Sequence, residues 1–143
     1  MIYKIDENLF QGSVPKDPTD LYCLVEKKRK IDAIINLMSL EEEFYFKPQV
    51  DAYLHLPIYD GPNPGIQWLK MAIGIATHLR EKYPLLIHCY AGISRSTTLT
   101  AAVLMQEKKW KMDKALEYIA VINPSIDPAR NFLKLLKEFE KEI

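Results

Sequence analysis

The chain has 143 residues, of which 48% are hydrophobic and 27% charged, and 19 lysines and arginines balance 19 aspartates and glutamates. This composition predicts one soluble globular domain over residues 1–143, and it excludes a disordered or fibrous chain. The zero net charge argues against a broad basic surface for nucleic acid or for anionic membrane.

The first 30 residues are expected to contain two short strands and one helix. Apolar runs at residues 1–5 and 9–11 predict an edge pair of strands. Asp17 followed by Pro18 is typical of a helix start, because aspartate caps free amides and proline suits the first turn. One apolar face follows, and the basic run KKRK would end this helix.

The middle of the chain predicts two strands with a short helix between them. Residues 33–37 (AIINL) form an apolar run without helical period, which indicates a buried strand. Ser39 and Glu42 have the spacing of a capping box, which predicts a short helix. Residues 53–58 alternate enough for a second strand, and the glycines and prolines of residues 60–65 predict a loop.

The second half of the chain is mostly helical in pattern. Apolar residues recur at three- and four-residue spacing over residues 66–82, which predicts an amphipathic helix. Residues 85–88 form a short apolar strand, and a largely buried helix is expected over 96–108. Two further helices, over 113–122 and 127–143, would each open on an aspartate cap.

Strands that alternate with helices predict an α/β fold, with a central, mainly parallel sheet of about four or five strands and helices on both faces. Ligands of such sheets bind beyond the carboxyl ends of the strands. The stretch HCYAGISRS, residues 88–96, begins at a strand end and runs into a helix. It is therefore the candidate site.

This stretch has the properties of an anion-binding loop. Backbone N–H groups converge where a strand passes through a tight loop into a helix, and the helix start adds partial positive charge. Arginine can grip two phosphate oxygens at once through its forked guanidinium. We expect the substrate's phosphate to be bound by six consecutive residues: Tyr90, Ala91, Gly92, Ile93, Ser94 and Arg95.

Cys89 lies at the start of this loop, next to His88. The field that attracts phosphate also favours a thiolate, which is the nucleophilic form of cysteine. A thiolate beneath a bound phosphate is aligned for in-line attack and would form a phosphocysteine. The hydroxyl of Ser96 can then donate a hydrogen bond to the departing sulfur.

The leaving oxygen also needs a proton, and the loop contains no acid. Asp60 is the best candidate, because it follows a predicted strand and precedes a segment rich in glycine and proline. The same carboxylate would then act as the base for the hydrolytic water. Asp51 is the second choice, although it comes before that strand rather than after it.

The sequence His88-Cys89, five further residues and Arg95-Ser96 resembles the signature of cysteine-dependent protein tyrosine phosphatases, most closely the dual-specificity branch. The resemblance implies a parallel-sheet α/β fold, a phosphocysteine mechanism, no metal and no cofactor. It implies that Cys89 is the nucleophile, Asp60 the acid and base, Arg95 the phosphate grip and Ser96 the aid to thiolate departure, while His88 orients the loop. It covers nearly the whole chain through four more stretches: NLFQGS, AIINL, LHLPIYD and INPSIDPARNFLKLL.

Departures from the family pattern bear on the substrate. The acid segment reads PIYD rather than tryptophan-proline-aspartate, and the chain has no room for the phosphotyrosine-recognition segment of the larger tyrosine-specific enzymes. The resemblance therefore implies a shallower pocket that also accepts phosphoserine and phosphothreonine. The loop contains no lysine, which favours phosphorylated proteins over phosphoinositides.

Three alternatives stay open at this point. The same loop chemistry could serve RNA 5′ ends or phosphoinositides. A catalytically silent phosphobinding module would require Cys89, Asp60 or Arg95 to be missing, and all three are present. A sulfurtransferase of the rhodanese kind also uses a loop cysteine, but it would give Asp60 no role.

The remaining polar residues predict no second site. Cys23 is expected to be a packed thiol; the resemblance offers, as the less favoured alternative, a reversible disulfide to Cys89 of the protective kind found in some relatives. His55 and His78 lack metal-ligand spacing. We expect phosphorylated proteins as substrates, a monomer, no nucleic acid and no membrane. Because the chain shows no signal peptide and no apolar run of about 18 residues, we expect it to work in the cytoplasm.

Overall fold

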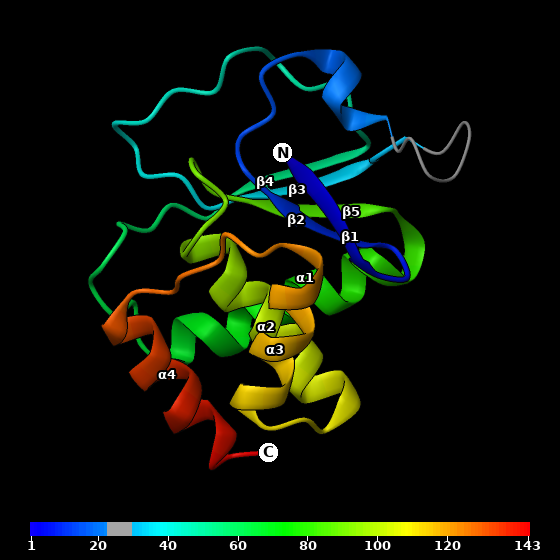
Figure 1. Ribbon diagram of the computed structural model, residues 1–143. Coiled ribbons are helices and arrows are strands. Elements are labelled where there is room, and N and C mark those ends of the chain that lie inside the picture. Colours follow the sequence, from blue (N-terminus) through cyan, green and yellow to red (C-terminus); the bar gives the residue numbers. More distant parts are fainter. Residues whose placement is uncertain (23–29) are drawn as a thin grey trace.

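A five-stranded sheet forms the centre of the fold. The computed structural model describes residues 1–22 and 30–143 (Figure 1). The strands, in chain order, are β1 Ile2–Asp6, β2 Leu9–Gly12, β3 Ala33–Asn36, β4 Ala52–His55 and β5 Leu85–His88. They lie side by side in the order β1-β2-β5-β3-β4. Only β1 is antiparallel to its neighbour, which confirms the mainly parallel sheet and the N-terminal edge pair.

The central strand β5 sets the position of the candidate site. All of its residues are buried, as expected for an apolar strand covered on both faces. The register of the parallel strands aligns four final residues along one edge of the sheet: Gly12 of β2, His88 of β5, Asn36 of β3 and His55 of β4. The chain leaves β5 at that edge, so the loop that contains Cys89 begins among the ends of three other strands.

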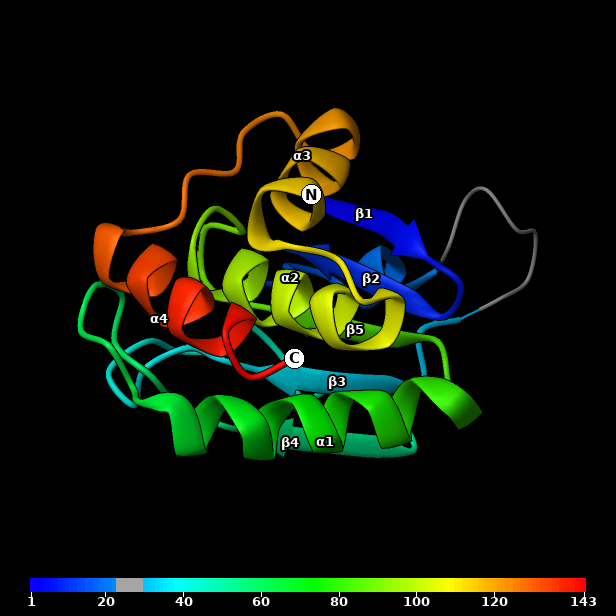
Figure 2. The ribbon, with the colours of Figure 1, turned by 90° about the horizontal axis from the view of Figure 1, so that it is seen from below.

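In residues 1–22 and 30–143, the α-helices are four, and they cover one face of the sheet (Figures 1 and 2). They are α1 Ile66–Lys82, α2 Arg95–Lys108, α3 Met112–Ile122 and α4 Arg130–Glu140. Ile35 and Ile87 of the sheet share one apolar core with Ile73 of α1, Leu99 of α2 and Phe132 of α4. In the part of the chain that the structure describes, no helix is long and apolar enough to cross a membrane.

The other face of the sheet is covered by irregular chain and one short 3₁₀ helix, η1 (Pro18–Leu21). Phe10, Ile34 and Leu86 point to this face and pack with Leu21 in a second, smaller core. The α/β class is confirmed. Within the described residues, however, the prediction of helices on both faces is met on this side only by η1, because the chain between β3 and β4 covers the face without forming a helix.

The predicted helix after Asp17 begins as expected. The Asp17 carboxylate accepts a hydrogen bond of 2.8 Å from the N–H of Thr19, and Pro18 occupies the first position of η1. The continuation of that predicted helix, which includes Cys23, falls on residues 23–29 and lies outside the described residues.

The later helices agree with the sequence in order but differ at their starts. Both α1 and β5 have the predicted bounds. The prediction of aspartate caps for the last two helices is wrong. The first N–H of α3, at Met112, donates instead to the Glu140 carboxylate of α4 at 2.7 Å. Helix α4 begins at Arg130, since Pro128 disfavours helical geometry at Asp127.

Candidate active site

The cysteine loop, residues 89–94, joins β5 to α2 and packs against the end of β2. Gly92 has a φ of 75°, and a Cβ there would lie 2.5 Å from the nitrogen of Ser13 and 2.6 Å from the carbonyl carbon of Gly12. Both the conformation and the close approach require glycine. The N–H of Cys89 donates to the carbonyl oxygen of Gly12 at 3.4 Å. The end of β2 therefore fixes the position of the loop relative to the sheet.

A buried polar network supports the loop from below. The Gln11 amide nitrogen donates to the carbonyl oxygen of Gly92 at 2.8 Å and to Ser96 Oγ at 2.9 Å. The Asn123 amide nitrogen donates to Gln11 Oε1 at 2.9 Å. The sequence pattern did not single out Gln11 or Asn123 as site residues. The one local signal was Gln11, a polar residue inside a buried strand. Because the network is buried, it holds the loop in one conformation.

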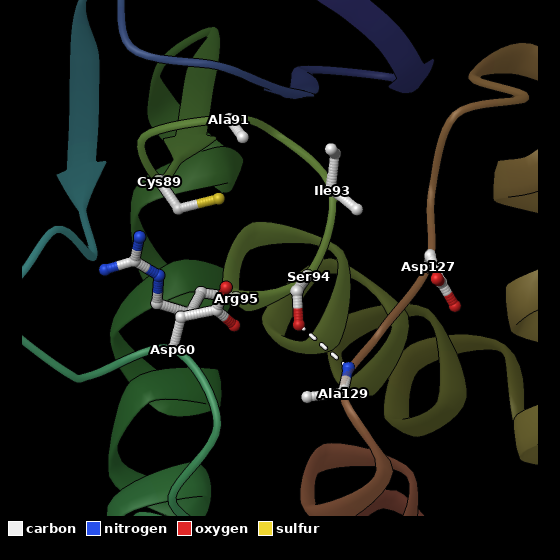
Figure 3. Close-up of a pocket in the computed structure, with 8 residues that line it drawn as sticks. All are labelled: Asp60, Cys89, Ala91, Ile93, Ser94, Arg95, Asp127 and Ala129. Carbon is white, nitrogen blue, oxygen red and sulfur yellow. Dashed lines mark hydrogen bonds between the residues drawn. The ribbon is translucent and has the colours of Figure 1, made fainter.

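Eight residues line a pocket of about 160 Å³ above Cys89: Asp60, Cys89, Ala91, Ile93, Ser94, Arg95, Asp127 and Ala129 (Figure 3). Cys89 is 2% exposed, and its Sγ lies 3.2 Å from Ser96 Oγ. The structure thus brings together Cys89, Arg95, Ser96 and Asp60, although Asp60 is distant in the sequence. Their arrangement leaves the sulfur at the floor of the pocket.

Two of the six residues expected to bind phosphate do not line the pocket. The Tyr90 side chain is exposed, and its hydroxyl lies 3.0 Å from that of Tyr45. Gly92 faces Gly12 and shapes the loop from behind. Ser94 lines the pocket, but its hydroxyl accepts a hydrogen bond of 2.9 Å from the N–H of Ala129. The segment before α4 is fastened to the cysteine loop in this way.

Arg95 is fixed by a carboxylate that the sequence did not assign to the site. Its Nη1 donates to Glu42 Oε1 at 2.6 Å and its Nη2 to Glu42 Oε2 at 3.1 Å, while Nη1 also donates to the carbonyl oxygen of Ile58 at 3.1 Å. Arg95 Nε is buried and has no hydrogen-bond partner among the described residues. Both Nη atoms of the guanidinium are thus paired with protein groups, whereas Nε remains available to a bound ligand.

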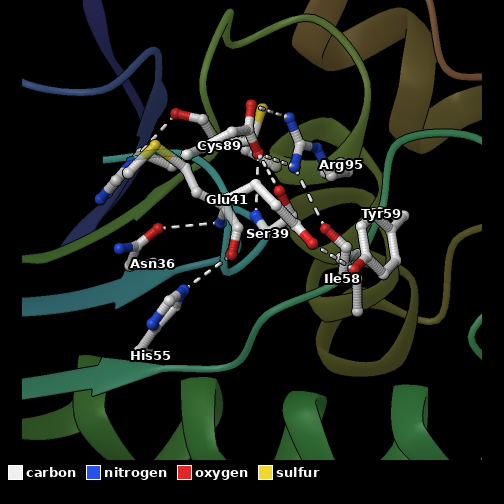
Figure 4. A network of polar contacts seen from close by, with 12 residues as sticks. Asn36, Ser39, Glu41, His55, Ile58, Tyr59, Cys89 and Arg95 are labelled. Carbon is white, nitrogen blue, oxygen red and sulfur yellow. Dashed lines mark hydrogen bonds and ion pairs between the residues drawn. The ribbon is translucent and has the colours of Figure 1, made fainter. Parts of the chain in front are cut away.

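Asn36 and His55, at the ends of β3 and β4, hydrogen-bond to the backbone that leads into the turn of Ser39 and Glu41 (Figure 4). The Asn36 side chain accepts from the N–H of Met38 at 2.8 Å, and His55 Nε2 donates to the carbonyl oxygen of Met38 at 2.7 Å. The N–H of Ser39 donates to the Glu42 carboxylate at 2.8 Å, but residues 39–42 form a turn and no helix. The predicted short helix is therefore wrong. The Glu42 carboxylate keeps the local hydrogen bond to Ser39 and also binds Arg95.

Glu42 should make stability depend on pH. The hydrogen bond from Arg95 lowers the pKa of Glu42 to about 2, from its usual 4.5. A depressed carboxyl pKa contributes stability that is complete above the unfolded value and is lost as pH falls. We expect Glu42→Gln to lower the free energy of unfolding by about 1–3 kcal/mol at neutral pH, because a buried arginine loses its partner.

Denaturant unfolding of both proteins between neutral pH and about pH 3 checks this expectation. The difference between wild type and Glu42→Gln should stay constant above about pH 5 and shrink as the pH falls from there toward 3, because the unfolded carboxyl, with a pKa of 4.5, binds a proton before the folded one, with a pKa of about 2. A difference that stays constant over this range would show that the ion pair contributes nothing to stability.

Two other aspartates bear on the choice of the acid. Asp51 precedes β4 and so lies at the opposite end of the sheet from the cysteine loop, which removes the second-choice acid. Asp127, which sequence reasoning treated only as a helix cap, lines the pocket across from Asp60, but its side chain points away from Cys89 (Figure 3). Asp60 is exposed at the pocket rim.

His88 lies behind the loop rather than in the pocket. It is fully buried, its Nδ1 donates to the carbonyl oxygen of Cys89 at 3.0 Å, and Phe44 packs against the ring with 5.3 Å between centroids. Burial lowers its pKa to about 4, so the ring is neutral at physiological pH. Within the described residues, no three His, Cys, Asp or Glu side chains form a potential metal site.

Comparisons with known proteins agree with this geometry. Residues 13–142 match the family model of the dual specificity phosphatase catalytic domain. Tyrosine-protein phosphatase yvh1 of Schizosaccharomyces pombe is 32% identical over 136 residues, which are 95% of this chain and 40% of that protein. The chain therefore spans less than half the length of this relative.

Two solved structures show the same fold over nearly the whole chain. The human tyrosine phosphatase-like serine/threonine/tyrosine-interacting protein has a TM-score of 0.83 at 27% identity, with 99% of this chain and 96% of that chain covered. PTPMT1 in complex with PI(5)P has a TM-score of 0.79 at 29% identity, with 99% and 95% covered. Since its relative yvh1 is named a tyrosine-protein phosphatase and the family model covers most of its residues, this chain belongs to the dual specificity phosphatase catalytic-domain family.

Proposed function

We propose that this chain hydrolyses phosphotyrosine, and also phosphoserine and phosphothreonine, in proteins through a phosphocysteine intermediate. The observation that carries the proposal is a pocket thiol next to an arginine with one unpaired nitrogen. Arg95 lines the pocket, and its buried Nε has no partner among the described residues. Because buried N–H groups are almost always paired, a phosphate oxygen in the pocket is a suitable partner for it.

In the first step, Cys89 Sγ attacks phosphorus as the thiolate, in line with the leaving oxygen. The sulfur–phosphorus bond forms as the bond from phosphorus to the leaving oxygen breaks. Asp60 donates its proton to that oxygen, which departs as the neutral tyrosine, serine or threonine hydroxyl. Arg95 Nε and the backbone N–H groups of the cysteine loop stabilise the charge on the other phosphate oxygens.

In the second step, water attacks the phosphocysteine and Asp60 takes its proton. The sulfur–phosphorus bond breaks and inorganic phosphate leaves. The sulfur departs with the bonding electrons, and the Ser96 hydroxyl at 3.2 Å donates a hydrogen bond to it. His88 transfers no proton in this scheme, because it is neutral, buried and hydrogen-bonded to the backbone.

The charges around the pocket favour a singly phosphorylated substrate. Arg95 is the one cationic side chain among the pocket-lining residues, and Glu42 already neutralises it. The other ionisable lining residues besides Cys89 are the acids Asp60 and Asp127. A polyanion such as an RNA 5′-triphosphate would meet these carboxylates with its additional phosphates, whereas a phosphorylated peptide would not.

Two alternatives have support from the names of similar structures. PTPMT1 was solved with PI(5)P, which favours a phosphoinositide as the second candidate substrate. The serine/threonine/tyrosine-interacting protein is named tyrosine phosphatase-like, which supports a phosphobinding module without catalysis as a further candidate. Against a binding module, Cys89, Arg95 and Asp60 line one pocket in this chain.

A substrate panel tests the proposal. We expect the purified protein to hydrolyse phosphotyrosine and phosphothreonine peptides faster than PI(5)P or an RNA 5′-triphosphate. Activity should persist in a chelator and stop with vanadate. Faster hydrolysis of PI(5)P than of either peptide would show that the preferred substrate is a lipid headgroup and not a phosphorylated protein. Binding of phosphopeptides without any hydrolysis would identify a binding module.

Other properties remain predictions. We propose that residues 1–143 act as a single catalytic domain, as a monomer in the cytoplasm, without metal or cofactor. Gel filtration coupled to light scattering would measure the oligomeric state, and a dimer would contradict this part of the proposal.

A further inference from the structure

Within the described residues, no hydrogen bond reaches the carboxylate of Asp60, and the residue is exposed. Its charge interacts with that of Arg95, but this attraction acts at a distance and does not fix the orientation of the carboxylate. Directly after it, Gly61 has a φ of 121°, and no atom lies within 4 Å of a Cβ built there. The position of this acid is therefore decided by its neighbours in the chain.

Ile58 and Tyr59, the two residues before Asp60, make three hydrogen bonds to other segments. The carbonyl oxygen of Ile58 accepts from Arg95, and the N–H of Ile58 donates to the carbonyl oxygen of Leu37 at 3.3 Å. The hydroxyl of Tyr59 donates to Glu41 Oε1 at 2.9 Å (Figure 4). Only the third contact involves the residue next to the acid, and only it can be removed without touching the backbone or Arg95.

Glu41 is placed well for this contact. It lies in the same turn as Glu42, which binds Arg95, so one short turn contacts both the phosphate grip and the acid segment. The hydrogen bond lowers the pKa of Glu41 and raises that of Tyr59, so that carboxylate and phenol both persist at neutral pH. Neither side chain lines the pocket.

We infer that the Tyr59–Glu41 hydrogen bond positions Asp60 for proton transfer, which makes both side chains positioning residues of the reaction. The inference rests on the proposed function, in which Asp60 protonates the leaving oxygen. A misplaced acid slows the reaction most where the leaving oxygen is most basic, because such an oxygen needs the proton most. Leaving-group dependence therefore separates positioning from general support of the fold.

The experiment compares kcat/KM for a series of aryl phosphates whose leaving phenols decrease in acidity. Tyr59→Phe keeps the ring and removes only the hydroxyl. We expect it to reduce kcat/KM by about three- to tenfold for phenyl phosphate, the range of one lost hydrogen bond, and much less for p-nitrophenyl phosphate. Glu41→Ala should have the same effect. The double variant should be no worse than either single variant.

Two controls make the result specific. Tyr45→Phe removes another exposed tyrosine hydroxyl near the site, one that bonds Tyr90 and not the acid segment, and it should leave the leaving-group dependence unchanged. Glu41→Gln keeps an acceptor oxygen and should be less affected than Glu41→Ala. An equal loss on all aryl phosphates, a change in KM alone, or additive effects in the double variant would overturn the inference.

A test of the positioning role itself uses an Asp60→Asn background. There, Tyr59→Phe should have no further effect, and a further loss would show that Tyr59 acts on something other than the acid.

Failure of the proposed function would look different. If Asp60→Asn itself left the leaving-group dependence of the wild type unchanged, the assignment of the acid would be wrong. The positioning role would then fall with it.

Discussion

Replacing Cys89 by serine should abolish hydrolysis of every phosphate monoester that the wild-type protein accepts. The hydroxyl is similar in size to the thiol but stays protonated at neutral pH, so it cannot attack phosphorus as an anion. The loss should be about 10⁴-fold or more, since the phosphocysteine route is closed. Steady-state hydrolysis of p-nitrophenyl phosphate measures it.

The same variant should still bind phosphate. The Arg95 side chain and the backbone N–H groups of the cysteine loop do not depend on the sulfur, and Gly92 and Gln11 hold the loop in place. Titration of Cys89→Ser with a phosphotyrosine peptide should therefore give a dissociation constant close to the wild-type KM or below it. Residual turnover at more than about one part in a hundred would mean that another group is the nucleophile.

Replacing Asp60 by asparagine should slow hydrolysis of aryl phosphates by about 10²- to 10⁴-fold, the usual range for a lost general acid. Asparagine keeps the shape of the side chain but cannot give up a proton to the leaving oxygen. The fall of kcat/KM at high pH, which reports loss of the acidic proton, should flatten in the variant. Measurement of kcat/KM against pH for both proteins checks this.

Asp127 provides the matched control. It lines the same pocket, yet its carboxylate points away from Cys89. Asp127→Asn should therefore change kcat/KM by no more than about threefold and should keep the wild-type pH profile. If Asp127→Asn lost as much activity as Asp60→Asn, or if Asp60→Asn were fully active, the acid would have been assigned to the wrong residue.

The parts of the fold that were predictable depend on local signals. The apolar period of α1 and the proline after it fixed both ends of that helix, and the short apolar run of β5 fixed the central strand. The spacing of Cys89 and Arg95 placed them at the two ends of one connection, with Cys89 directly after β5 and Arg95 at the start of α2. Strand β4, which precedes Asp60, is parallel to β3, and β3 is parallel to β5. The segments that follow β4 and β5 therefore leave the sheet at the same edge, which made the position of Asp60 predictable.

The parts that were missed depend on contacts between distant residues. Glu42 forms the local hydrogen bonds of a capping box with Ser39, but Arg95, 53 positions away, binds its carboxylate. Gln11 and Asn123 are 112 positions apart and meet only because β2 and the end of α3 both pack beneath the cysteine loop. A single sequence shows the polar residue in each case but not its partner.

Different segments hold the floor of the pocket and its rim. Gln11 and Asn123 fix the floor, whereas Asp60 lies at the rim and the turn at residues 39–42 contacts the segment that carries it. Substrate preference can therefore diverge between relatives through exchange of rim residues other than the acid, while the chemical step is preserved. A chimera that imports a foreign rim should remain active as long as it retains an acid in place of Asp60 and the carboxylate that binds Arg95.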